Sequence, residues 1–414
     1  MTTRPCWVEI RTRALEENFR FLADLASPHA ELLAIVKANA YGHSLALCAP
    51  AVVSAGAKWL GVTSVEEGIV ARALCPEARV LIIGGVFPGQ AAAAIQFQLT
   101  PVAWENWQLD ELLAVARAAG AQAGSFPIHL EIDTGMSRQG VGPNDLATVL
   151  SRFGPGSPLR LEGVMTHLFA ADEADGQATQ EQLARLDESM SRISAAGLFA
   201  EWLNVGASAT LLAGQARVVA DLAARHGMKA MLRPGLALYG LIPRFDPAFD
   251  PSFDSAFGAP ADPLSAPSSL AEPATLAAAR AALQPLLTWK GSVAGVRSVP
   301  PGATVGYNAT FVATEPMRLA LVSAGYGDGL TRSLGNRFGL LVRGQRAPLV
   351  GRVSMDQIVL DVTEIPNVEP GDEVVILGVQ GNESITAFDH ADAAATIPWE
   401  VFTRIAARVP RIAV

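Results

Sequence analysis

Short apolar runs alternate with alanine-rich stretches from residue 12 to about residue 242. The runs are nearly continuous instead of alternating apolar with polar, which is typical of parallel strands covered by helices. Eight strand–helix units in this length predict a (β/α)8 barrel of the TIM type, because a doubly wound open sheet ordinarily has about six strands. The runs are LLAIVKA (32–38), WLGVTS (59–64), VLIIGG (80–85), LTPVAW (99–104), PIHLEID (127–133), LEGVMTH (161–167), WLNVGAS (202–208) and MLRPGLALYG (231–240).

Apolar residues at helical spacing predict helices between these strands. Examples are residues 14–25 and residues 183–196, the second of which follows the polar run QATQEQ (177–182). The pattern changes at residue 243, where phenylalanines recur at positions 245, 249, 253 and 257. Pro247 and Pro251 fall inside that repeat and would break a helix. We therefore expect an irregular insertion over 243–285, with helix returning at 275–283. A docking role for the phenylalanines is the weaker alternative.

After residue 285 the pattern predicts β-strands separated by the turn sequences PPG, EPM, GNR and EPGD. Two short helical patterns follow, at 387–395 and 399–406. The expected domains are a barrel over 1–242, the insertion over 243–285 and a mostly antiparallel β domain over 286–414. Residues 1–11 are a candidate strand that joins the β domain.

Composition narrows the classes of function. The 414 residues include 31 basic and 40 acidic ones, a net charge of −9, which disfavours nucleic acid or an anionic membrane as the main partner. The chain has three cysteines, Cys6, Cys48 and Cys75, which is an odd number, and none of them has CxxC spacing. We therefore expect reduced thiols and neither disulfides nor a metal site. The amino-terminal residues lack the apolar core of a signal peptide, and charges interrupt the apolar stretch 74–94. A cytoplasmic protein is expected.

Charged and polar residues at the strand ends are the candidate chemistry, because barrel enzymes place their active sites there. Lys37 follows five apolar residues. Burial would lower its pKa and make the amine a better nucleophile, although a lysine that extends its amine into solvent is an equal alternative. In EIDTGMSRQG (131–140), the Asp-Thr-Gly of an aspartic protease is followed by Met136 and has no second copy. We prefer a glycine-permitted turn that carries Arg138 over the barrel mouth to bind a carboxylate or phenolate.

Three more strands end in candidate groups. His167 ends the sixth run, Ser208 the seventh, and Pro234 would end the eighth strand at Arg233. Ser208 with the backbone amides of Gly235 and Leu236 can form a cup for a phosphate.

Eight segments together resemble the alanine racemases, barrel enzymes that depend on pyridoxal 5′-phosphate (PLP). The resemblance runs in order from about residue 7 to the carboxyl terminus, except for 243–285. The segments are AIVKANAYGH, EIDTGMSRQG, MTHLFAADE, LRPGLALYG, TVGYNATF, GYGDG, GRVSMDQ and TIPWEVFTRIAARVPR.

The resemblance implies a role for each site residue. Lys37 forms the Schiff base with PLP and is the base on one face of the substrate, and Tyr307 from the second subunit of a homodimer is the base on the other face. A racemase needs two such bases, since a proton leaves one face and returns to the opposite one. Arg233 faces the pyridine nitrogen, His167 links Arg233 to Tyr307, and Arg138 contacts the PLP phenolate and the substrate carboxylate. The resemblance also implies that the backbone amide of Met355 binds the substrate carboxylate, that Tyr326 lines the substrate entrance and that Asp356 supports the site. The residues implied to contact the phosphate are Tyr41, Ser208, Gly235 and Leu236.

Three positions depart from the family pattern. Glu131 stands where many members have a carbamylated lysine, and it can supply the same negative charge to Arg138. Trp399 replaces a tyrosine that usually bonds the phosphate, and an indole donates only one hydrogen bond. Ala207 replaces a common asparagine.

The predicted function is interconversion of L-alanine and D-alanine, a small amino-acid substrate, to supply peptidoglycan. A racemase of broader or shifted specificity is the nearest alternative. Barrel-type PLP decarboxylases are less favoured, because they use a cysteine in the β domain and no cysteine follows Cys75. PLP-binding barrels that serve cofactor homeostasis lack a β domain. Only the insertion over 243–285 would suggest a protein that acts solely by binding partners.

Overall fold

The computed structural model describes residues 5–173, 176–245 and 274–414. It divides into two compact units. The first, here the β unit, comprises Met1–Thr12, Tyr41–Leu47 and Leu286–Val414; the second, the barrel unit, comprises Arg13–Ala40 and Cys48–Pro285. The phenylalanine repeat predicted as an irregular insertion lies largely outside the described residues.

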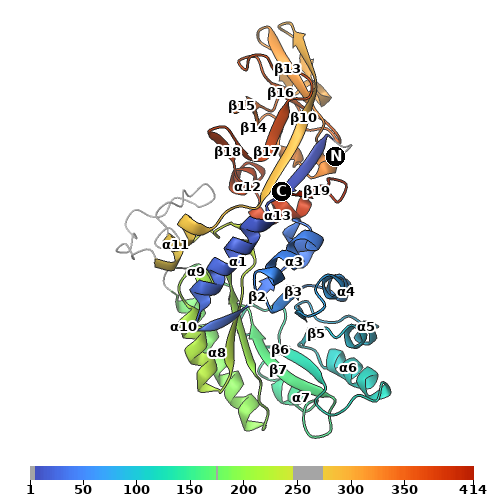
Figure 1. Ribbon diagram of the computed structural model, residues 1–414, viewed down its shortest axis with the longest axis vertical. Coiled ribbons are helices and arrows are strands. Elements are labelled where there is room, and N and C mark those ends of the chain that lie inside the picture. The colour runs from blue at the N-terminus through green and yellow to red at the C-terminus, as the bar shows by residue number, and fades with distance from the viewer. Residues whose placement is uncertain (1–4, 174–175, 246–273) are drawn as a thin grey trace. The chain divides into compact units, whose positions relative to one another are not determined.

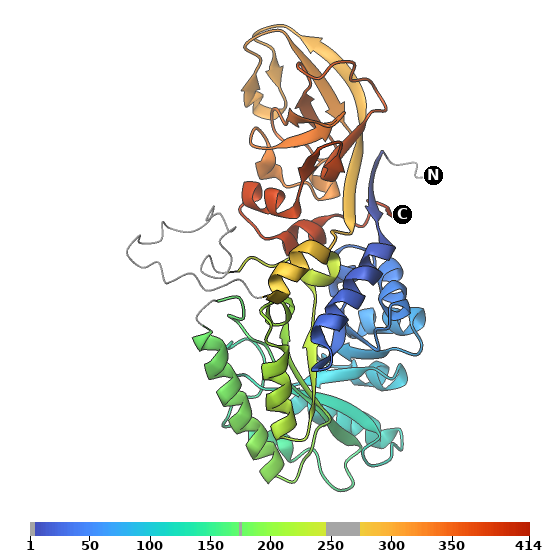
Figure 2. The same ribbon diagram turned by 60° about the vertical axis from the view of Figure 1, so that its left-hand side comes forward.

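Eight parallel strands close into a barrel in the barrel unit, in the order in which they occur along the chain (Figures 1 and 2). The first and last strands complete the closure, with Leu32 beside Leu232. The predicted barrel is therefore confirmed. Its strands are β2 (Ala30–Ile35), β3 (Trp59–Val62), β4 (Arg79–Ile82), β5 (Thr100–Ala103), β6 (Phe126–Glu131), β7 (Leu159–Thr166), β8 (Trp202–Ala207) and β9 (Lys229–Arg233).

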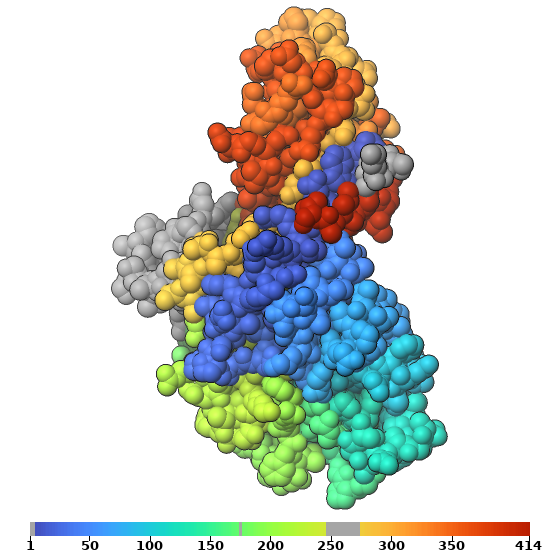
Figure 3. All heavy atoms as spheres, in the orientation of Figure 1, coloured from blue at the N-terminus to red at the C-terminus, as the bar shows by residue number. Residues whose placement is uncertain are grey.

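Helices pack around these strands through apolar faces. In α1, the buried residues Leu15, Phe19 and Leu22 recur at helical spacing. Figure 3 shows the blue-to-green residues of the barrel unit packed as one continuous body. The helices are α1 (Thr12–Ala26), α2 (Lys37–Tyr41), α3 (Leu45–Ser54), α4 (Val65–Leu74), α5 (Ala91–Gln96), α6 (Asn106–Ala118), α7 (Leu146–Leu150), α8 (Gln177–Ala195), α9 (Ser208–Leu212), α10 (Ala216–Arg225) and α11 (Ala274–Ala282), with a 3-10 turn η1 (Leu236–Tyr239).

Two boundaries differ from the sequence pattern. The first barrel strand ends at Ile35 and not at residue 38, because the chain turns sharply from Lys37 onward. Helix α8 begins at Gln177, so the polar run at 177–182 forms the first turns of the helix and does not precede it.

The β unit is a mostly antiparallel nine-stranded sheet with a separate pair, β11 and β12. Its main path runs β15-β14-β17-β10-β1-β19, and β13 joins β10 to β16. The strands near the two chain ends, β1 and β19, pair in parallel and lie side by side in both views (Figures 1 and 2). The predicted β-rich domain is confirmed as part of the fold.

The elements of the β unit are β1 (Cys6–Ile10), β10 (Leu287–Val299), β11 (Thr304–Val305), η2 (Tyr307–Ala309), β12 (Phe311–Val312), β13 (Met317–Val322), η3 (Tyr326–Asp328), η4 (Arg332–Leu334), β14 (Gly339–Val342), β15 (Gln345–Pro348), β16 (Ile358–Asp361), β17 (Glu373–Gln380), β18 (Glu383–Ile385), α12 (Ala387–Ala394), α13 (Pro398–Arg404) and β19 (Arg411–Ala413). One cluster of its core is formed by Val305, Ala313, Met317, Leu319 and Val350.

Candidate active site

Five groups singled out in the sequence lie at or after the carboxyl ends of barrel strands. Lys37 lies two residues after β2, His167 directly after β7 and Ser208 directly after β8. Arg233 is the last residue of β9, and Arg138 lies on the loop after β6. Parallel strands in a barrel share one carboxyl mouth, the end where barrel enzymes bind their substrates. The fold therefore brings these five groups to one mouth of the barrel unit.

Lys37 begins a left-handed turn. Residues 38–41 all have φ between 52° and 56°, a region that costs an L-residue about 1–2 kcal/mol. The Glu67 carboxylate accepts hydrogen bonds from the backbone N–H of Asn39 (3.2 Å) and of Thr63 (3.0 Å), which anchors the turn to the end of the next strand. The turn directs the chain away from the strand immediately after the lysine.

The amine of Lys37 is held in an environment that disfavours its cation. Burial lowers its pKa, and the positive charges of Arg138 and Arg233 lower it further, against a smaller opposing effect of Glu67. A lysine with a lowered pKa is a better nucleophile and base near neutral pH. Of the two interpretations of the strand-end lysine, these surroundings favour the reactive amine.

Arg233 is buried and heavily bonded. Its Nη1 donates to the carbonyl oxygen (2.8 Å) and the side-chain oxygen (2.7 Å) of Asn204, and its Nη2 donates to the Thr166 carbonyl oxygen (2.8 Å). Within the described residues, its Nε has no hydrogen-bond partner. Burial lowers the pKa of Arg233 to about 10, so the guanidinium stays charged at neutral pH. The guanidinium is fixed in place with one N–H group still available.

His167 is a neutral imidazole. Burial lowers its pKa to about 3, with further lowering by Arg233, Arg138 and Lys37. Its Nδ1 lies 3.1 Å from Nη2 of Arg233. Because the guanidinium can only donate, Nδ1 accepts, and this assigns the ring proton to Nε2.

Glu131 is 2% exposed, and its direct partner is Gln139. The Gln139 amide donates to the Glu131 carboxylate through a short hydrogen bond and to the Ile83 carbonyl oxygen at 3.2 Å. Burial raises the pKa of Glu131, against the lowering effects of Gln139, Arg233 and Arg138. Within the described residues Glu131 forms no ion pair with Arg138, and the two side chains interact only as charges at longer range. Nothing in the sequence pattern marks Gln139 as a site residue.

Ser208 joins the ends of β8 and β9. Its hydroxyl oxygen accepts hydrogen bonds from the backbone N–H of Gly235 (3.0 Å) and of Ala237 (3.2 Å). Leu236, between them, begins the 3-10 turn and is buried. These two bonds join the predicted phosphate-binding residues after the last two barrel strands, a place where barrels often bind a phosphate.

The other predicted site residues belong to the β unit. Three of them are exposed: Tyr307 at 67%, Met355 at 54% and Tyr326 at 43%. Trp399 lies half-buried in α13. Tyr41, which clusters with this unit, is buried, and burial raises the pKa of its phenol to about 12.

Asp356 is held by Arg408, an arginine that the sequence pattern does not mark as a site residue. Arg408 donates from Nη2 to Asp356 (2.7 Å) and from Nε to the buried Asp328 (2.9 Å). The backbone N–H of Tyr326 donates to the Ser354 carbonyl oxygen (3.0 Å). The segments that carry Tyr326 and Met355 are thereby tied together.

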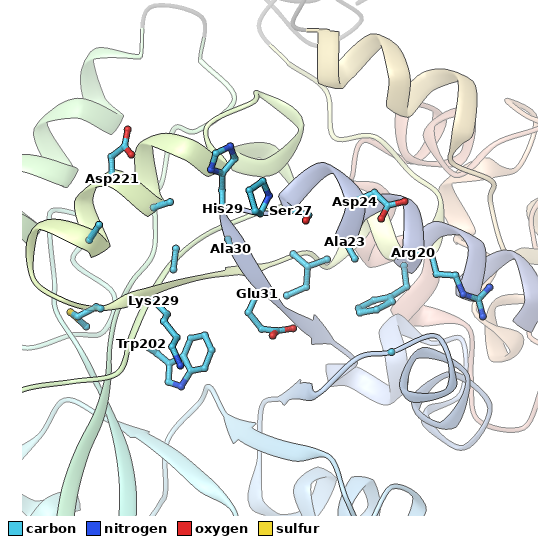
Figure 4. Close-up of a pocket in the computed structure, with 18 of the residues that line it drawn as sticks. Arg20, Ala23, Asp24, Ser27, His29, Ala30, Glu31, Trp202, Asp221 and Lys229 are labelled. Atoms are coloured by element: carbon cyan, nitrogen blue, oxygen red, sulfur yellow. The ribbon is translucent and has the colours of Figure 1, made fainter.

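A groove of about 820 Å³ lies at the opposite, amino end of the barrel strands. Figure 4 shows Lys229 beside Trp202 in this groove, with the ammonium 5.4 Å from the ring centroid. Lys229 is paired with Glu201 (3.0 Å), and Glu31 with Lys58 (2.8 Å). The groove is separate from the predicted chemistry, which gathers at the other mouth.

None of the helices in the described part of the chain has the length and apolar character needed to cross a bilayer.

A parallel barrel with a lysine and two arginines at its carboxyl mouth, joined to an antiparallel β unit, defines a barrel enzyme suited to amine chemistry on an anionic substrate. Residues 10–243 match the family model for the N-terminal domain of alanine racemase, and residues 286–413 match the model for its C-terminal domain. The chain belongs to the alanine racemase family of PLP-dependent isomerases.

Individual relatives cover almost the whole chain. The alanine racemase of Halothermothrix orenii is 32% identical over 99% of this chain and 97% of its own length, and that of Syntrophobacter fumaroxidans is 35% identical over 96% and 95%. The crystal structure of alanine racemase from Streptomyces lavendulae has 32% identity and a TM-score of 0.82, covering 100% of this chain and 98% of that one. The resemblance inferred from the sequence is confirmed.

Proposed function

We propose that this protein interconverts L-alanine and D-alanine with PLP bound at the carboxyl mouth of the barrel. The environment of Lys37 supports this reaction, because its pKa is lowered by burial and by the guanidinium groups of Arg138 and Arg233. The amines of the other three lysines are each paired with carboxylates: Lys58 with Glu31, Lys229 with Glu201, and Lys290 with Glu9 and Glu373. Lys37 is the one suited to react as a free amine.

The residues at the mouth fit PLP. Arg233 has an Nε–H without a partner among the described residues, suited to an acceptor such as a pyridine nitrogen, and Ser208 and Gly235 lie after the last two barrel strands, where barrels often bind a phosphate. Lys37 would hold the cofactor covalently, and Arg138 would contact its phenolate. The phosphate would be held by Tyr41, Ser208, Gly235, Leu236 and Trp399.

PLP, when bound, supplies delocalisation for the electron pair that remains when the α-proton leaves. Nζ of Lys37 takes or returns that proton on one face of the substrate. The phenol oxygen of the partner subunit's Tyr307 does so on the other face, so that a proton lost from one side is replaced from the opposite side. The substrate carboxylate is bound by the Arg138 guanidinium and by the backbone N–H of Met355.

Arg233 and His167 set the protonation of the site. Arg233 keeps its proton at neutral pH and therefore holds a pyridine nitrogen unprotonated, which limits delocalisation and restrains side reactions such as transamination and decarboxylation. His167 is neutral with its proton on Nε2, so it can donate a hydrogen bond to the phenolate of the partner subunit's Tyr307 and help deprotonate the phenol.

The wider proposal is a cytoplasmic homodimer with shared active sites that supplies D-alanine for peptidoglycan. A racemase of broader specificity is the second candidate, because Glu131, Trp399 and Ala207 depart from the family pattern near the cofactor.

A panel of L-amino acids tests the proposed reaction. The purified protein with PLP is incubated with each one, and both inversion of configuration and release of CO2 are measured. L-Alanine should be racemised with the highest kcat/KM and without CO2. Preferential racemisation of larger amino acids would support the second candidate, and CO2 release without inversion would contradict racemisation.

A further inference from the structure

Gln182 lies in the first half of helix α8 and is fully buried. Its side-chain amide makes three hydrogen bonds. Nε2 donates to the Thr134 hydroxyl (2.9 Å) and to the His167 carbonyl oxygen (2.9 Å), and Oε1 accepts from the backbone N–H of Phe169 (3.0 Å). One amide thus contacts two separate loops at the barrel mouth.

The first of these loops follows β6 and carries Arg138. The Asp133 carboxylate accepts hydrogen bonds from the backbone N–H of Gly135 (2.9 Å) and of Ser137 (3.1 Å), which folds the loop tightly just before the arginine. Arg185, one turn after Gln182 in α8, donates to the Thr134 carbonyl oxygen (2.8 Å). Helix α8 therefore holds Thr134 at two points, its side-chain hydroxyl and its backbone carbonyl oxygen.

The second loop follows β7 and carries His167, whose ring contacts Arg233. The Thr166 hydroxyl lies 2.8 Å from the Thr134 hydroxyl and donates to the Ile132 carbonyl oxygen (2.9 Å). The two loops are thus bonded to each other as well as to Gln182.

We infer that Gln182 is a positioning residue that couples the Arg138 loop to the His167 loop, so that both reach the geometry that racemisation needs. The inference rests on the proposed function. Two N–H donors and one carbonyl acceptor are needed at the same buried point, and only an amide supplies them. Asparagine is shorter by one methylene, and glutamate offers no second donor.

The matched pair Gln182→Glu and Gln180→Glu tests this inference. Gln180 lies on the same helix and is exposed, so its variant makes the same chemical change without touching either loop. For Gln182→Glu we expect KM for L-alanine to rise through Arg138 and kcat to fall through His167, each by about tenfold or more, since small displacements of positioning groups have large effects on rate. Gln180→Glu should match the wild type in both constants.

Hydrogen exchange provides a readout that does not depend on activity or on PLP. In Gln182→Glu, backbone amides in 132–141 and 166–170 should exchange faster than in the wild type, while the distant strand β10 should be unchanged. If Gln182→Glu does not fold, Gln182→Met keeps the length and volume of the side chain and Thr134→Val removes the hydroxyl from the same network, and either should give the same pattern. Unchanged exchange in both loops, or a loss of melting temperature with kcat and KM intact, would overturn the inference. A wild-type protein that fails to racemise alanine would contradict the proposed function instead, and the exchange result would still decide the role of Gln182.

Discussion

Lys37 differs from the other lysines of the chain in what surrounds its amine. Two arginines lower its pKa in addition to burial, whereas acidic partners surround the others. The left-handed turn that begins after Lys37 keeps the strand short, so the amine lies just beyond the end of a buried strand. An amine in these surroundings is neutral more often than a lysine in water, and so it is available to form a covalent bond.

We expect PLP to attach to Lys37. Reduction of the holoenzyme with borohydride fixes the cofactor on the lysine that holds it, and peptide mapping then locates the pyridoxyl group. The group should be found in the peptide that contains Lys37. Its recovery on Lys58, Lys229 or Lys290 would refute the assignment.

Replacement of Glu131 by glutamine should weaken binding at the mouth. The variant keeps the size of the side chain but removes the negative charge, which lies near Arg138 and Arg233 and accepts a hydrogen bond from Gln139; a hydrogen bond to a charged group is worth about 1.5–3 kcal/mol. KM for L-alanine or the dissociation constant of PLP should rise accordingly. Glu188→Gln, at an exposed position of α8, is the control. Kinetics of Glu131→Gln identical to the wild type would mean that Glu131 does not act on Arg138.

The site residues that could be predicted are those that follow an apolar run. Lys37, His167 and Ser208 each interrupt such a run at its end, and the barrel pattern then places them at one mouth. Gln182 and Gln139 carry no such signal, since a glutamine in a polar run has the composition of an exposed helix face. Their importance comes from contacts with residues distant in sequence, which periodicity does not encode.

Elements were predicted well where their pattern is repetitive. All eight barrel strands occur where the apolar runs indicate them, because the buried strands of a parallel barrel leave a continuous signal. The left-handed turn at 38–41 could not be predicted. Its sequence ANAY contains no glycine, and local preference alone favours an ordinary helix or strand there. The fold around the turn overrides that preference.

The strain in this turn should be measurable. Ala38 is exposed and has a φ of 52°, which is unfavourable for alanine but not for glycine. Ala38→Gly should therefore raise the free energy of unfolding of the apoprotein by about 1 kcal/mol, a net value that includes the larger loss of chain entropy when glycine folds. Ala114→Gly, in the exposed interior of α6, should lower it by about 1 kcal/mol. Urea denaturation compares them. Destabilisation by both variants to the same extent would show that the turn is not strained.

The stability of the whole molecule should decline in mild acid. Burial lowers the pKa of His390 to about 4 and that of His167 to about 3. The unfolded chain binds these protons near pH 6.5 and the folded one only at lower pH, so their stabilisation is complete above pH 6.5 and is lost as the pH falls toward 3.

For His390 the loss between pH 7 and pH 5 is about 2 kcal/mol. His390→Gln keeps a donor for the Ile376 carbonyl oxygen, which His390 contacts at 2.6 Å, and removes the titration. Between pH 7 and pH 5, the free energy of unfolding of this variant should therefore fall by about 2 kcal/mol less than that of the wild type. If the stability of the variant depends on pH as strongly as that of the wild type, His390 is not a source of the acid sensitivity.

At the scale of the assembly, we propose that each active site combines Lys37 of one protomer with Tyr307 of another. Tyr307 belongs to the β unit and is 67% exposed, which leaves its phenol available to a second copy of the chain. In a twofold dimer, each β unit can close its partner's barrel and supply the base on the opposite face of the substrate.

Mixed dimers of Lys37→Ala and Tyr307→Phe test whether the two residues act in one shared site. Each variant alone should be nearly inactive. The two are unfolded and refolded together, and mass spectrometry confirms that subunits have exchanged. If Tyr307 acts on the partner's site, one site of the heterodimer carries both substitutions and the other carries neither, so about half the wild-type activity per heterodimer should return. If Tyr307 acts within its own protomer, every site keeps one defect, and confirmed exchange without recovery of racemisation would contradict the shared site.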